Sequence, residues 1–164
     1  MNFELHVPSG ARLDAPLPGS VGGYTEPKKG AVPEPAQCSD CDAVYYEGRW
    51  RWGSVPLSAQ EVRCPACERL RNNKPAAWLT LEGASVAAHR EEMKRVARQR
   101  EASQRARYPL QRIMRIEDTP RGLRATTTDV YLARVIGEAL REAYGGALHF
   151  GYDQQGNLKL RWER

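Results

Sequence analysis

Two Cys-x-x-Cys motifs constrain the fold of this chain more than any other feature of its sequence. Cys38 and Cys41 form the first motif, Cys64 and Cys67 form the second, and the 164 residues contain no other cysteine. Within one motif both thiols can point inward from a single turn, so two motifs supply the four sulfur ligands of a tetrahedral ion. We therefore predict a structural metal site closed by two such knuckles on neighbouring hairpins. Zinc is the default ion, and iron fits the same four sulfurs.

Other uses of the cysteines remain as alternatives. A redox-active dithiol normally lies in a strand–helix–strand unit, and neither motif does; unrelated buried thiols are the second alternative. A zinc ion held by four thiolates has no open position for water, so we expect no metal catalysis. The chain also lacks a phosphate-binding loop, a nucleophile elbow and a dinucleotide motif, and we expect neither an enzyme nor a small-molecule substrate.

The positive charge of the chain is concentrated in one segment. The net charge is +5, and residues 85–116 carry nine basic and three acidic side chains, whereas the segments on either side are close to neutral. A local excess of this kind is typical of a surface that contacts a polyanion. A solvated helix that ties two small domains together is the alternative interpretation.

The predicted fold class is α+β, with a four-cysteine zinc ribbon, a basic helix and a small ββαββ module. In chain order, we expect a flexible tail over residues 1–37, the zinc ribbon over 38–83, the basic linking helix over 84–108 and the ββαββ module over 109–164.

The patterns within these parts predict several local features. Glu47-Gly48 is expected to form the turn of a hairpin, and residues 76–83 are expected to give the metal-binding unit a third strand. Ser85 is the expected N-cap of the basic helix, whose apolar stripe ends at about its middle. A second helix, from about Asp129 to Tyr144, is expected between the two hairpins of the last part.

Basic side chains of two segments are the candidate contacts for a nucleic acid, because guanidinium and ammonium groups bind phosphate. In the hairpin, alternation places Trp50 and Trp52 on one face and Arg49 and Arg51 on the other. We expect both tryptophans in the core of the metal-binding unit, and a platform for stacking bases is the alternative. The basic helix supplies the remaining candidates: Arg90, Lys94, Arg95, Arg98, Arg100, Arg105 and Arg107.

Six stretches of the chain carry a resemblance to a known family: CSDCDAVYYEGRWRW, CPACERL, HREEM, YPLQRIMRIE, TTTDVYLARVIGEALREAYGGAL and LKLRW. Over roughly residues 24–164 the sequence resembles an uncharacterised family of bacterial zinc-ribbon proteins, which implies bound zinc and no particular activity. Its cysteine knuckles are also distantly similar to those of the archaeal and eukaryotic adaptor family that escorts the large ribosomal subunit to export. That similarity implies a ribosomal or RNA partner. The glycine that usually follows each knuckle of a zinc ribbon is replaced by Asp42 and Glu68.

The function predicted from these features is a non-catalytic zinc-binding protein of the bacterial cytoplasm that binds RNA or the ribosome through its basic helix. A protein–protein adaptor with a structural zinc and an electron carrier with iron in the cysteine cage are the alternatives. The first residues lack the regions of a signal peptide, and no segment approaches the roughly 18 apolar residues of a membrane span. We therefore expect a cytoplasmic location without a membrane partner, where thiols stay reduced.

Overall fold

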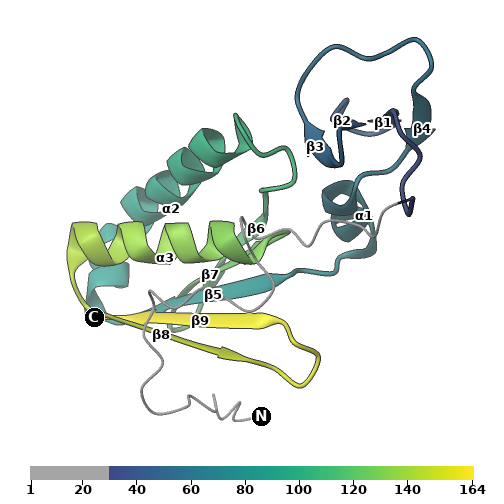
Figure 1. The fold of residues 1–164 in the computed structure, drawn as a ribbon. Coiled ribbons are helices and arrows are strands. Elements are labelled where there is room, and N and C mark those ends of the chain that lie inside the picture. Colours follow the sequence, from purple (N-terminus) through teal and green to yellow (C-terminus); the bar gives the residue numbers. More distant parts are fainter. Residues whose placement is uncertain (1–29) are drawn as a thin grey trace.

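The computed structural model describes residues 30–164, which form three helices and two sheets in a mixed α/β arrangement (Figure 1). In chain order the elements are β1 (Ala36–Cys38), β2 (Val44–Tyr46), β3 (Arg49–Arg51), β4 (Gln60–Val62), α1 (Pro65–Asn72), β5 (Ala77–Glu82), α2 (Ala84–Arg105), β6 (Ile113–Thr119), β7 (Gly122–Thr127), α3 (Val130–Tyr144), β8 (Ala147–Tyr152) and β9 (Leu158–Glu163). Most of the predicted tail lies outside the described residues, and its last two positions form the start of β1. Within the described part, no helix is both long and apolar enough to cross a membrane.

The smaller sheet has the strand order β3-β2-β1-β4, with β1 antiparallel to β2 and parallel to β4. The predicted hairpin turn is confirmed, because Glu47 and Gly48 join β2 to β3 with φ angles of 53° and 77°. Two successive positive φ angles match the right-handed twist of the flanking strands. The rings of Tyr45 and Trp50, 5.4 Å apart between centroids, pack from this hairpin into the same buried cluster as the cysteines.

The larger sheet has the order β6-β7-β5-β9-β8, and β5 lies at its centre, antiparallel to β7 and parallel to β9. A strand therefore forms where one was expected over residues 76–83, but the expectation that it completes the metal-binding unit is wrong. Every second residue of β5 is buried and belongs to the main core, together with side chains of the two long helices: Ala77, Leu79 and Leu81. In the larger sheet β5 pairs with two strands along its whole length, which the three-residue strands of the smaller sheet are too short to allow.

The elements from β6 to β9 follow the predicted order of two hairpins separated by a helix. The hairpins do not pair with each other, because β5 is inserted between β7 and β9. Helices α2 and α3 cover one face of the five strands (Figure 1). The buried side chains of the two helices belong to the same core cluster as Trp162 of β9. They include Val86 and Met93 from α2 and Ile136 and Leu140 from α3.

The ends of the helices differ in part from expectation. Helix α2 begins at Ala84 with Gly83 as its N-cap, so Ser85 is inside the helix and is not the cap. Gly83 takes a φ of 109°, which favours glycine, and the backbone N–H of Ser85 donates to the carbonyl of Arg164 at 3.2 Å. The predicted start of α3 is correct, since Asp129 caps it by accepting from the N–H of Leu132 at 3.0 Å.

Candidate metal centre

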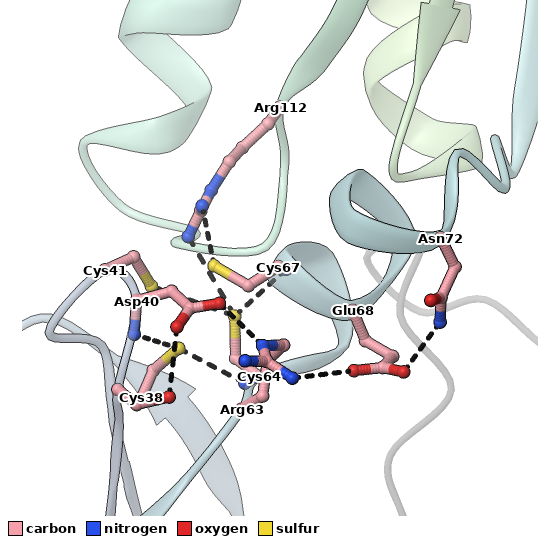
Figure 2. Close-up of polar contacts among 10 residues, drawn as sticks. Cys38, Asp40, Cys41, Arg63, Cys64, Cys67, Glu68, Asn72 and Arg112 are labelled. Atoms are coloured by element: carbon pink, nitrogen blue, oxygen red, sulfur yellow. Dashed lines mark hydrogen bonds and ion pairs between the residues drawn. The ribbon is translucent and has the colours of Figure 1, made fainter.

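The four cysteines come together at one point between the smaller sheet and α1 (Figure 2). Their sulfur atoms all lie within 4.8 Å of one another, and all four residues are free cysteines. A tetrahedral ion with sulfurs at about 2.3 Å requires the sulfurs to be about 3.8 Å apart. The sulfurs of Cys41 and Cys64 are 3.8 Å apart. The donor set and its spacing therefore fit one metal ion, as the sequence predicts.

The first knuckle is held by the end of β1 and the turn that follows it. The N–H of Cys38 donates to the carbonyl of Ala43 at 2.7 Å, and the N–H of Asp42 donates back to the carbonyl of Cys38 at 3.2 Å. Asp42 has a φ of 64°, the left-handed conformation for which zinc ribbons commonly use glycine. Aspartate is among the few residues that tolerate this conformation. The missing glycine thus does not prevent the turn.

The second knuckle is not on a hairpin, and this part of the prediction is wrong. Cys64 is the N-cap of α1, and its sulfur accepts from the N–H of Cys67 at 3.4 Å. Pro65 follows at the first helical position, where its missing N–H costs nothing and its fixed φ suits the helix. Glu68 continues the helix, with its N–H donating to the carbonyl of Cys64 at 2.9 Å, so no glycine is needed there.

Backbone N–H groups and burial set the acidity of the thiols. Burial opposes ionisation of Cys38, but donation from the N–H groups of Cys64 at 3.2 Å and Asp40 at 3.5 Å lowers its pKa to about 7. Burial raises the pKa of Cys67 to about 11 and raises the pKa of Cys64 still further. Four thiolates this close together repel one another in a poorly solvated site, so their joint ionisation requires a cation among them.

Arg112 contributes a positive charge to the site from outside the two cysteine motifs. It lies just before β6, its side chain is buried, and its Nη1 donates to the sulfur of Cys67 at 3.2 Å while Nη2 lies 4.0 Å from the sulfur of Cys64 (Figure 2). Its Nε donates to the carbonyl of Pro109 at 2.8 Å, and its backbone N–H donates to the hydroxyl of Thr128 at 3.0 Å. The carbonyl of Pro109 thereby orients the guanidinium toward the sulfur cluster, and Thr128, directly after β7, holds the backbone of Arg112.

In the sequence, Arg112 stands out only as one of the nine basic residues in its segment. It is 45 residues away from Cys67 in the chain, and no spacing rule connects the two positions. Leu110, two residues earlier, belongs to the buried cluster of the cysteines. The segment between α2 and β6 therefore returns to the metal centre and joins it to the rest of the fold.

The structure divides the predicted basic contacts into two groups. Arg90 and Lys94 lie at 2.7 Å and 3.2 Å from the carboxylate of Asp118, and Arg90 also donates to the carbonyl of Gly122. Lys94 also lies 2.8 Å from the carboxylate of Glu91, so the two charges are balanced by one carboxylate of the β6–β7 hairpin and one of the helix itself. The other candidates, four on the helix and one two residues after its end, are exposed, and within residues 30–164 none of them forms an ion pair: Arg95, Arg98, Arg100, Arg105 and Arg107.

The hairpin arginines and the tryptophans also separate. Arg49 is exposed, whereas Arg51 lies 3.1 Å from the carboxylate of Glu47 and stacks over the ring of Tyr46. Trp50 is buried as predicted, but the prediction that Trp52 shares its core is wrong. Because β3 ends at Arg51, the alternation of faces stops there, and Trp52 turns to the end of α2, where 37% of its surface stays exposed.

The comparisons with known proteins gave no match: no family model, no curated protein and no solved structure is significantly similar to the chain.

Proposed function

We propose that the protein is a non-catalytic zinc-binding protein that binds RNA, free or within the ribosome, through the C-terminal half of α2. On the residues quoted above, we also propose that it belongs with the bacterial zinc-ribbon proteins and acts in the cytoplasm. In that assignment the smaller sheet and α1 form the ribbon, with the second knuckle at a helix start, and the elements from β6 to β9 form the ββαββ part.

Zinc is supported by the composition of the donor set. Four cysteine sulfurs at tetrahedral spacing match the ligand set of structural zinc sites, in which the protein supplies every ligand. Such an ion adds folding free energy to a unit whose strands are only three residues long. When bound, zinc would supply charge and rigidity to the knuckles and would leave no position for a substrate.

RNA binding is carried by one observation, the uncompensated positive charge at the end of α2. Arg98, Arg100, Arg105 and Arg107 are exposed and form no ion pair with any of residues 30–164. In the first half of the same helix, Arg90 and Lys94 pair with Asp118 and Glu91, so the excess lies at the second half. A cluster of free guanidinium groups suits phosphates, whose neutralisation releases counterions and makes binding fall with salt.

Charge reversal tests this function directly. Arg98→Glu together with Arg100→Glu should weaken binding of a labelled single-stranded RNA by at least about tenfold, and wild-type binding should fall steeply between low and moderate salt. The matched control is Arg121→Glu together with Arg141→Glu, which changes the net charge equally at exposed positions outside this half of α2. Equal losses in both double variants, or binding that does not respond to salt, would rule out the proposed surface.

An adaptor function is the second candidate, and the β3–β4 loop is the feature that favours it. Val55 is 41% exposed and Leu57 is fully exposed in this loop. Apolar side chains held in water at a loop tip are typical of contacts with another protein. Loss of a captured protein partner on Leu57→Ser, with RNA binding absent, would favour the adaptor over the RNA-binding protein.

A further inference from the structure

Trp52 joins the two segments that the sequence singled out separately as nucleic-acid contacts. Its indole Nε1 donates to the backbone carbonyl of Arg105 at 2.6 Å, which fixes the ring at the end of α2. The guanidinium carbon of Arg105 lies 6.0 Å from the centre of the same ring. The ring is therefore held by its edge, while 37% of the residue surface remains exposed.

An open hollow of about 370 Å³ lies beside this ring, lined by Trp52, Glu101, Ala102, Arg105 and Ala106. The hollow exists because two of the helix positions next to the indole are alanines, whose side chains do not reach across it. The carboxylate of Glu101 accepts from the backbone N–H of Ile113 at 2.7 Å, so it is directed to the protein. The lining thus combines an aromatic wall, a floor of small side chains and a guanidinium group.

The charges around the hollow complement a phosphate backbone. Arg98 lies one helical turn before Ala102 on the same side of α2, and Arg105 lies about one turn after Ala102. Arg107 lies two residues after the end of the helix and is exposed. Phosphates tracked by these side chains would carry their bases past the exposed indole.

We infer that this hollow receives an unpaired base of single-stranded RNA, stacked on Trp52, while Arg98, Arg105 and Arg107 bind the flanking phosphates. The inference rests on the proposed RNA binding and specifies its form. In a duplex the bases are already stacked and paired, so only single-stranded segments can place a base against an aromatic ring. A ring that is already fixed loses little conformational entropy when the base binds.

Two substitutions of Trp52 separate stacking from anchoring of the hairpin. Trp52→Phe keeps an aromatic ring but removes the N–H that donates to Arg105, whereas Trp52→Ala removes both. We expect Trp52→Ala to weaken binding of a short single-stranded RNA on the order of tenfold. Trp52→Phe should retain most of the affinity, and Ala102→Met, which fills the hollow from the helix side, should weaken binding as Trp52→Ala does.

The measurement is fluorescence anisotropy with one labelled RNA strand and with the duplex of that strand and its complement. The wild type and Trp52→Phe should prefer the single strand, Trp52→Ala and Ala102→Met should lose that preference, and binding of the duplex should change little. A single strand substituted with thiouridine should photo-crosslink to Trp52 or to residues 102–106 of α2, as located by mass spectrometry.

Distinct results separate this inference from the proposed function. If Arg98→Glu with Arg100→Glu abolishes RNA binding but Trp52→Ala does not, RNA binding stands and the base site is wrong. Equal losses in Trp52→Phe and Trp52→Ala, or equal wild-type affinities for strand and duplex, also overturn the base site. If the wild type binds no RNA in either form, the base site and the proposed function both fail.

Discussion

Replacing Arg112 by Gln should weaken zinc binding while leaving the backbone of the site in place. The side chain donates to the sulfur of Cys67 at 3.2 Å and approaches that of Cys64 at 4.0 Å. A hydrogen bond to a charged acceptor contributes about 1.5–3 kcal/mol, and only the shorter contact is close enough to count fully. We therefore expect a loss of about 2 kcal/mol in the free energy of zinc binding, or roughly a 30-fold higher Kd.

The same change should have little effect on the metal-free protein. A guanidinium that is 5% exposed carries a desolvation cost, which only ionised sulfurs offset well. In the variant the two backbone hydrogen bonds between Arg112 and Thr128 persist, and the donation from Nε to the carbonyl of Pro109 is lost. Arg112→Lys should recover part of the affinity, since it keeps the charge but not the planar fork.

Competition with a zinc chelator at fixed pH measures these affinities, and Arg63→Gln is the matched control. Arg63 lies close to the same knuckles but pairs with the carboxylates of Asp40 at 2.6 Å and Glu68 at 3.6 Å, and its side chain is 28% exposed. Its replacement should change the zinc Kd much less, as expected for a partly exposed ion pair. Wild-type zinc affinity in Arg112→Gln, or equal losses in both variants, would refute the assigned role of Arg112.

Two further predictions concern the rest of the fold. Cys64→Ser should remove the protection of backbone amides from exchange in the segment from β1 to α1, and it should leave the five-stranded sheet protected, because the main core contains no cysteine. Hydrogen exchange measured segment by segment tests this prediction, and loss of amide protection in both sheets together would contradict it. Burial raises the pKa of Asp129 to about 6 from its ordinary 3.8, against donation from the N–H groups of Leu132 and Tyr131, so folding favours the protonated carboxyl. Stability should therefore fall by about 3 kcal/mol as the pH rises from about 4 to about 6 and then level off. Asp129→Asn keeps a capping oxygen but cannot ionise, so its free energy of unfolding, measured with denaturant, should not fall between these pH values. An equal fall in the wild type and the variant would show that another group causes it.

Local patterns were sufficient for the cysteine cluster and for much of the secondary structure. Two residues between the cysteines of each motif determine which sulfurs can share a knuckle, and this relation is independent of the remaining fold. The hairpin turn at Glu47-Gly48 and the start of α3 at Asp129 also depend only on neighbouring residues. These features were predicted correctly because their causes lie within a few positions of the chain.

The errors arise where a distant partner decides the outcome. Residues 77–82 read as a strand, but their pairing with β9 joins positions about 80 residues apart, which no local pattern reveals. Trp52 was assigned to the core by alternation, yet its position is set by the carbonyl of Arg105. Arg112 was counted with the surface charge, although a cluster 45 residues away in the chain holds it. The burial of a side chain and the pairing of its charge depend on which distant segments pack together, and a local sequence pattern does not contain that information.

The sulfurs of Cys38, Cys41, Cys64 and Cys67 lie together as for one metal ion, and we propose that they form a closed centre with one zinc ion per chain. The most direct test of this proposal is elemental analysis of the protein purified without added metal, with protein concentration determined independently. We expect one equivalent of zinc per chain and a colourless protein. A coloured protein with one equivalent of iron would contradict the zinc assignment and favour electron transfer, and a folded protein without bound metal would contradict the metal centre itself.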